Sequence, residues 1–235
     1  MARFRPNPDF LAGYPPRPTY RLSTSPTQLS HLLIAFVVLT IDIALVRTQI
    51  SVFQSPTGVA AGVPAFEGSL GVAALAALTG FVAHEMAHKV AAQRHGFWAE
   101  FRMSPAGLLF SLATALFGFL LALPGATVIG GMGDAREWGR TSVAGPATNL
   151  VFGAAFLGAA FWVGQSYAAP NLWASLMFLA FVNGIFAAFN LLPFGPLDGR
   201  KVLRWSPAAW TLAFGLALLF IGAVLSVLLF FVPTF

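Results

Sequence analysis

Long apolar segments, separated by short stretches rich in polar residues, glycine and proline, are the dominant pattern of this chain. About 20 apolar residues in helical conformation cross the hydrocarbon core of a bilayer, so each long segment predicts a membrane-spanning helix. The five predicted spans are residues 28–46, 68–92, 143–163, 172–192 and 207–232. A sixth apolar segment, 107–123, has 17 residues, which is the lower limit for a span. The pattern therefore predicts an all-α polytopic membrane protein with about six apolar segments.

Two shorter stretches have the alternation that is typical of β-strands rather than helices. Residues 97–102 follow the second span, and their alternation predicts a strand at the membrane interface. Residues 126–131 follow Pro124 and Gly125, and they also have β-like character. We therefore expect a small interfacial β element beside the helices.

Composition supports the membrane assignment and narrows the chemistry. The chain is 57% hydrophobic and 9% charged, whereas soluble domains carry about 25% charged residues. It contains no cysteine, so disulfides and thiolate metal sites are excluded, and histidine and carboxylate side chains are the remaining candidate ligands. The net charge of +5 does not indicate nucleic-acid binding, because the basic residues are scattered and have no aromatic platforms between them.

The second predicted span ends in the sequence His84-Glu85-Met86-Ala87-His88, which has the pattern H-E-x-x-H. Histidines four apart leave the same face of a helix, so both imidazoles can bind one metal ion. Glu85 lies about 100° round the helix from His84, which is where a general base beside a metal belongs. The alternative is a pair of interfacial histidines whose side chains reach toward the headgroups.

A catalytic zinc usually has three protein ligands, so a third ligand is expected elsewhere in the chain. The candidate acids near membrane depth are Asp42, Glu67 and Asp198. Asp198 is favoured because Pro193 and its neighbouring glycines and prolines interrupt the helix there, and irregular backbone at membrane depth is tolerated only where it lines a cavity or is buried. Asp42, inside the first span, is more simply explained by pairing with Arg47 or with neighbouring helices.

These motifs together resemble the site-2 protease family of intramembrane zinc metalloproteases. The resemblance covers roughly residues 68–205 and depends on the H-E-x-x-H motif together with Asn190-x-x-Pro193-x-x-x-x-Asp198-Gly199, with a third motif, Gly145-Pro146-x-x-Asn149, between them. It implies that His84, His88 and Asp198 bind one Zn²⁺ per chain and that Glu85 is the catalytic base. It further implies that Asn190 helps to hold the substrate backbone and that Asn149 stabilises the oxyanion.

The expected function is therefore hydrolysis of peptide bonds in or near transmembrane helices of other membrane proteins. Two alternatives use the same residues differently. A membrane protein that binds or transports metal needs the ligands but not Glu85 as a base, and an inactive scaffold that binds transmembrane helices needs neither. The sequence names no substrate, cut site, trigger or oligomeric state.

The distribution of charge predicts how the chain crosses the membrane. All ligands must lie at one depth, so we expect residues 107–131 to be re-entrant, with a helix that enters the membrane and a strand that returns to the same side. This topology, with a cytoplasmic N-terminus, leaves only Arg47 of the 13 basic residues outside. The twelve on the inner side are Arg3, Arg5, Arg17, Arg21, Lys89, Arg94, Arg102, Arg136, Arg140, Arg200, Lys201 and Arg204. If the segment crossed completely, the last five of these would move outside, and the split would be 7 to 6.

The expected organisation of the chain has four parts. Residues 1–26 form a cytoplasmic arm rich in proline and arginine, and residues 27–67 form the first span and an outer loop. Residues 68–205 form the metalloprotease core, and residues 206–235 form the C-terminal span. We expect the protein to lie in the cell membrane, with its active site toward the cytoplasm.

Overall fold

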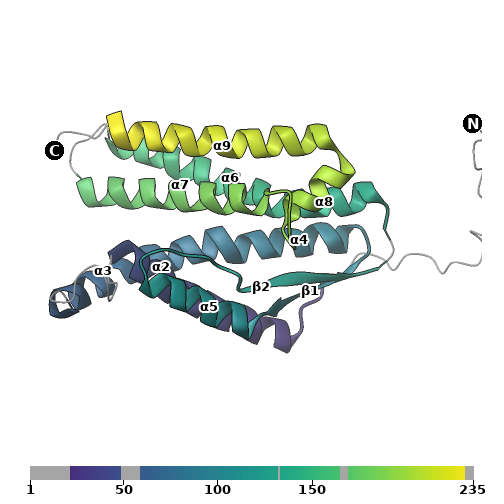
Figure 1. Ribbon diagram of the computed structural model, residues 1–235, viewed down its shortest axis with the longest axis horizontal. Coiled ribbons are helices and arrows are strands. Elements are labelled where there is room, and N and C mark those ends of the chain that lie inside the picture. Colours follow the sequence, from purple (N-terminus) through teal and green to yellow (C-terminus); the bar gives the residue numbers. More distant parts are fainter. Residues whose placement is uncertain (1–21, 49–58, 132, 165–168, 231–235) are drawn as a thin grey trace, which may run out of the picture.

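The computed structural model describes residues 22–48, 59–131, 133–164 and 169–230, which form a mostly helical structure with one small sheet (Figure 1). The predicted arm lies largely outside this range. The helices are α2 (Pro26–Thr48), α3 (Val59–Ala77), α4 (Ala83–Arg94), α5 (Pro105–Leu116), α6 (Ala135–Gly164), α7 (Pro170–Asn190), α8 (Asp198–Trp205) and α9 (Pro207–Phe230). A π-helical turn, η1 (Leu78–Val82), joins α3 to α4, and the strands are β1 (Trp98–Met103) and β2 (Gly125–Gly130).

Five helical segments in the described part of the chain are long and apolar enough to cross a membrane. They confirm the five predicted spans and indicate a multi-pass membrane protein. Their bounds are Pro26–Thr48, Phe66–Arg94, Ala135–Gly164, Pro170–Asn190 and Pro207–Phe230.

The sixth apolar segment is a short helix followed by an extended return. Helix α5 has 12 residues, or about 18 Å at 1.5 Å per residue, which is too short for a hydrocarbon core about 30 Å thick. The helix ends at Leu116, and Gly118, two residues later, has a φ of 85°, the left-handed conformation that commonly follows the end of a helix. The chain then returns as β2, and Gly125 pairs with Met103 at the end of β1. The two ends of the segment therefore lie side by side, which favours the re-entrant shape over a full crossing.

Helix α6 begins eight residues before the predicted span, because a capping box starts it. The backbone N–H of Glu137 donates to Asp134 Oδ1 (2.8 Å), and the backbone N–H of Asp134 donates to Glu137 Oε2 (3.0 Å). This reciprocal pair satisfies two N–H groups that are otherwise free at a helix start. The charged stretch before residue 143 is therefore helical, and it extends α6 beyond the apolar span.

Helix α4 lies between two groups of elements (Figure 1). Helices α6, α7 and α9 pack together on one side, and α2, α5 and the sheet lie on the other. Two buried side-chain hydrogen bonds join α2 to its neighbours. Lys89 Nζ of α4 donates to Gln28 Oε1 (2.6 Å), and Ser111 Oγ of α5 donates to Asp42 Oδ2 (2.6 Å). Asp42 therefore contacts a neighbouring helix, which agrees with one of its two predicted explanations; the other was pairing with Arg47. Arg47 instead donates to Ser175 Oγ (3.3 Å).

Candidate metal centre

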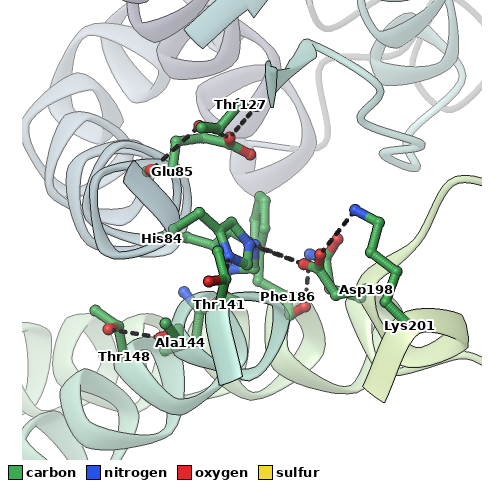
Figure 2. A network of polar contacts seen from close by, with 12 residues as sticks. His84, Glu85, Thr127, Thr141, Ala144, Thr148, Phe186, Asp198 and Lys201 are labelled. Atoms are coloured by element: carbon green, nitrogen blue, oxygen red, sulfur yellow. Dashed lines mark hydrogen bonds and ion pairs between the residues drawn. The ribbon is translucent and has the colours of Figure 1, made fainter. Parts of the chain in front are cut away.

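Two histidines of α4 and the first residue of α8 meet in the interior (Figure 2). The Nε2 atoms of His84 and His88 are 3.0 Å apart, and Asp198 Oδ2 lies 3.4 Å from the first and 2.8 Å from the second. All three residues are buried. The structure thus brings Asp198 to two histidines that are more than a hundred residues away in the sequence, in the last third of the second predicted span.

The opposite ring nitrogens fix the orientation of both imidazoles. His88 Nδ1 lies 2.8 Å from the carbonyl oxygen of Thr141, which only accepts, so this nitrogen carries the hydrogen. His84 Nδ1 lies 2.6 Å from Oδ1 of Asn149, and it donates to that oxygen for the same reason. In the neutral imidazoles, both Nε2 atoms therefore direct a lone pair toward Asp198 Oδ2. Such partners fix the tautomer of metal-binding histidines.

The amide of Asn149 is itself held by a second layer of buried groups. Its Nδ2 donates to the carbonyl oxygen of Gly80 (2.9 Å) and lies 3.3 Å from Oδ1 of Asn183. Asn183 Nδ2 in turn donates to Thr79 Oγ1 (3.0 Å). Thr79 and Gly80 lie in the π-turn η1, and π-turns inside helices are frequent at functional sites. These contacts settle which end of the Asn149 amide faces His84.

The three converging atoms fit a divalent metal ion. A single proton can bridge only two of them, whereas a cation between them contacts all three and offsets the repulsion of the lone pairs. Two ligand atoms of a tetrahedral zinc, each about 2.0–2.1 Å from the metal, lie about 3.3 Å apart, and the observed separations are close to this value. Two imidazoles and one carboxylate are also a ligand set that zinc uses in catalytic sites.

Gly145 of α6 leaves the space that such an ion needs. A Cβ atom added at this position would overlap with the Nε2 atoms of both His88 and His84. The methyl group would therefore occupy the side of the imidazole pair toward which the lone pairs point. A residue with a side chain would not fit at this position of the motif, so the motif requires glycine there.

We predict that Gly145→Ala lowers zinc content to below about a tenth of the wild-type value, because the methyl group competes with the metal for one space. Zinc per chain is measured on purified protein by mass spectrometry. The matched control is Gly158→Ala on the same helix, where an added Cβ meets nothing within 4 Å. Full zinc occupancy in Gly145→Ala would contradict the assignment of the metal position.

Asp198 is presented by the break between α7 and α8. Helix α7 ends at Asn190, and α8 begins with Asp198 itself. The next residue, Gly199, lies so close to the carbonyl oxygen of Leu191 that a side chain would overlap with it. Burial by itself raises the pKa of Asp198, but the interactions with His88 and His84 outweigh burial and hold the pKa of this carboxyl below its usual range. The carboxylate is therefore ionised at neutral pH, as a metal ligand must be.

The side chain of Glu85 points away from His84 and Asp198 and toward Thr127 of the sheet (Figure 2). Its Oε2 accepts from the backbone N–H of Thr127 (2.8 Å) and from the Thr127 hydroxyl (2.7 Å). The same hydroxyl lies 3.2 Å from the backbone oxygen of Glu85. Strand β2 thus holds the carboxylate that the sequence predicts to be the base.

The metal group, Glu85 and Thr127 line one cavity of about 230 Å³. Its walls include His84, His88, Asp198 and Glu85, the edge of β2 and the end of α7 with Asn190. The Nδ2 of Asn190 donates to the carbonyl oxygen of Phe186 (2.9 Å). Asn149 lies behind His84 and is fully buried. The oxyanion role of Asn149 and the substrate-holding role of Asn190 stay predictions.

Sequence reasoning missed Thr127, Thr141 and Asn183 as partners of the site. Thr141 contributes a backbone carbonyl, to which no side-chain pattern points. Asn183 is a polar residue in the middle of an apolar span, and that position was an available signal. Thr127 is a small polar residue in a β-like run, a common arrangement that carries no signal of its own.

The fold and this group of residues define a class of protein: a multi-pass membrane protein with a buried two-histidine, one-aspartate centre next to a glutamate. Comparison with known proteins agrees with this class. The chain is 31% identical over 152 residues to "Putative zinc metalloprotease MJ0611" of Methanocaldococcus jannaschii, a match that covers 60% of this chain and 73% of that protein. It is 34% identical over 128 residues to "Putative zinc metalloprotease Rip3" of Mycobacterium tuberculosis.

The chain belongs to the site-2 protease family. The match to Rip3 covers 54% of this chain but 28% of that longer protein, so it concerns a part of Rip3 only. No family model matches the chain, and no solved structure matches it.

Proposed function

We propose that this protein is an intramembrane zinc metalloprotease that hydrolyses peptide bonds in or near the transmembrane helices of other membrane proteins. The observation that carries the proposal is the position of Glu85, which lines the same cavity as His84, His88 and Asp198. Metal binding or transport alone requires the three ligands but gives no role to an acid beside them. Both named relatives are described as zinc metalloproteases, which supports the same chemistry.

In the proposed mechanism His84, His88 and Asp198 hold the metal, and the buried partners of the histidines keep both Nε2 atoms directed at it. When bound by these three residues, a zinc ion would supply Lewis-acid chemistry, which would polarise a water molecule and the substrate carbonyl. Glu85 Oε2 takes a proton from the water and later delivers it to the nitrogen of the leaving amine. The low exposure of the site limits competing solvent, which strengthens each of these interactions.

A transmembrane substrate must unwind before it can be cut, because its carbonyl groups are hydrogen-bonded within a helix. We propose that the unwound segment adds as a strand to β2. This strand pairs with β1 on one side and has no second strand partner among the described residues. Gly125, Thr127 and Ile129 of this region line the cavity together with the metal centre, so a peptide paired there lies beside the reacting groups.

We predict that Ile129→Pro lowers cleavage at least tenfold while zinc content stays unchanged. Thr127 directs its N–H away from β1, and alternate residues of an antiparallel strand face the same side, so the N–H of Ile129 also lies on the outer edge. Proline removes that N–H without removing a bond to β1. Ile129→Val, which keeps the N–H, is the matched control, and cleavage by Ile129→Pro at the wild-type rate would refute strand addition.

The proposed function is tested with the purified protein in detergent micelles and a synthetic leucine–alanine transmembrane peptide that has a central proline. We expect about one zinc per chain, cleavage of the peptide, loss of cleavage after chelation, and recovery after zinc is restored. Cleavage products are identified by mass spectrometry. A protein that retains zinc and never cleaves such peptides would leave metal binding as its function.

We further propose that the N-terminus and the metal centre face the cytoplasm, because this orientation places 12 of the 13 basic residues on the inner side. Arg136→Cys, in a chain that has no other cysteine, gives a single labelling site in the first turn of α6. We expect a membrane-impermeant maleimide to label it in inverted vesicles and not in intact cells. Arg47→Cys is the matched control and should show the reverse, whereas labelling of position 136 from outside only would overturn this orientation.

A further inference from the structure

The backbone N–H of Thr127 is a hydrogen-bond donor that both the proposed base, Glu85, and a substrate strand paired with β2 would use. It belongs to the outer edge of β2, where an added strand takes its hydrogen bonds. It already donates to Glu85 Oε2 (2.8 Å). An N–H group forms one strong hydrogen bond, so a substrate carbonyl that pairs with Thr127 must displace Glu85 from it.

The Thr127 hydroxyl reinforces this contact. It lies 2.7 Å from Glu85 Oε2, so two donors from one residue hold a single carboxylate oxygen. The lone pairs of that oxygen are then directed at β2, and the carboxylate points away from His84 and Asp198 (Figure 2). The arrangement is a resting position, because both donors of Thr127 hold Oε2 against β2 and away from the metal centre.

We propose that Thr127 holds Glu85 in this resting position and that pairing of the substrate with β2 releases it. The inference rests on the proposed function and adds a control step to it: the base becomes available only when an extended peptide lies on the strand. A substrate carbonyl takes the N–H of Thr127, and Glu85 loses that bond. The freed Oε2 then takes a proton from water, the water oxygen bonds to the carbonyl carbon, and the proton passes to the leaving nitrogen as the C–N bond breaks. Thr127 is thus a positioning residue, and it couples substrate binding to catalysis.

Because Glu85 and the peptide compete for the N–H of Thr127, loss of the Glu85 carboxylate should tighten binding of the peptide. We therefore expect Glu85→Ala, which cannot cleave, to bind the peptide more tightly than the wild type by about threefold to tenfold, the effect of about one hydrogen bond. The probe is the same leucine–alanine peptide with a fluorescent label. Its dissociation constant is measured by anisotropy with metal-free protein in micelles, so that no variant cleaves it.

Three further variants serve as supporting tests and controls. Glu85→Gln retains a neutral acceptor for Thr127 and should bind with intermediate affinity, and it replaces Glu85→Ala if that variant does not fold. Thr127→Val removes the hydroxyl but keeps the N–H, so in the zinc-loaded enzyme we expect KM to fall about twofold to fivefold with kcat retained. Glu67→Ala, an exposed acid of α3, controls for the loss of charge.

Equal affinities of the wild type and Glu85→Ala overturn the inference, even where the zinc-loaded wild type cleaves the peptide. A fall in kcat with unchanged KM in Thr127→Val also overturns it, because that result means that the contact is productive and not a resting state. Absence of cleavage by the zinc-loaded wild type refutes the proposed function instead. The two failures are therefore distinguishable.

Discussion

Glu85→Gln is expected to keep its zinc and to lose peptide cleavage by about a hundredfold to ten-thousandfold. This range is what a positioned general base contributes to a reaction. The side chain keeps its size and can still accept from Thr127, so the fold and the cavity should persist. The amide cannot take a proton from water at neutral pH, and the loss should appear in kcat and in kcat/KM alike. Zinc content and the cleavage rate are measured on the same preparation.

Glu67→Gln is the matched control for this experiment, since Glu67 is an acid of the same membrane segment but is exposed. It should retain both zinc and activity. Cleavage by Glu85→Gln within about tenfold of the wild type would remove Glu85 from the role of base. The proposal would then need another proton acceptor, and no other carboxylate except Asp198 lines the cavity among the described residues.

Asp198→Asn is expected to lose both zinc and cleavage. Replacement of an outer partner of a metal ligand typically costs about 10- to 100-fold in metal affinity, and replacement of a ligand itself should cost more. The amide also removes the negative charge that offsets the cation, and its NH₂ group is a poor metal ligand. Zinc affinity is measured by titration against a competing chelator, and cleavage is measured with excess zinc.

Asp42→Asn is the control that tests whether the effect is specific to Asp198. Asp42 is also buried and lies in a membrane span, but its Oδ2 accepts from Ser111. We expect this variant to keep its zinc, with some loss of stability, because the pair joins α2 to α5. If Asp42→Asn lost zinc and Asp198→Asn kept it, the third ligand would be misassigned.

The sequence predicted well those features that depend on neighbouring residues. Hydrophobicity over about 20 residues gave the five spans, because membrane thickness fixes the length of an apolar helix. The four-residue spacing of His84 and His88 placed both rings on one helical face, because 3.6 residues complete a turn. The sequence also indicated both strands, since alternation is a local property. Hydrophobicity alone did not indicate that α6 begins at Ala135, ahead of the apolar span, because the start of that helix depends on the capping box of Asp134 and Glu137.

The third member of the metal group needed more than local pattern. The sequence offered Asp42, Glu67 and Asp198 as acids, and the broken helix around Asp198 favoured that one. The structure brings Asp198 to 2.8 Å from His88, directs Asp42 to α5 and leaves Glu67 exposed. The choice follows from packing of α4, α6 and α8, which no single segment of sequence encodes.

The sequence by itself determined that the chain crosses the membrane several times and that one helix carries two metal-binding rings and an acid between them. Only the tertiary structure decided what surrounds those rings: the carbonyl of Thr141 and the amide of Asn149 behind them, Gly145 beside them, and Thr127 on the carboxylate of Glu85. The physical reason is that helix periodicity and hydrophobic length act within a segment. The direction of a lone pair and the partner of a buried carboxylate are set by side chains that arrive from other segments when the helices pack.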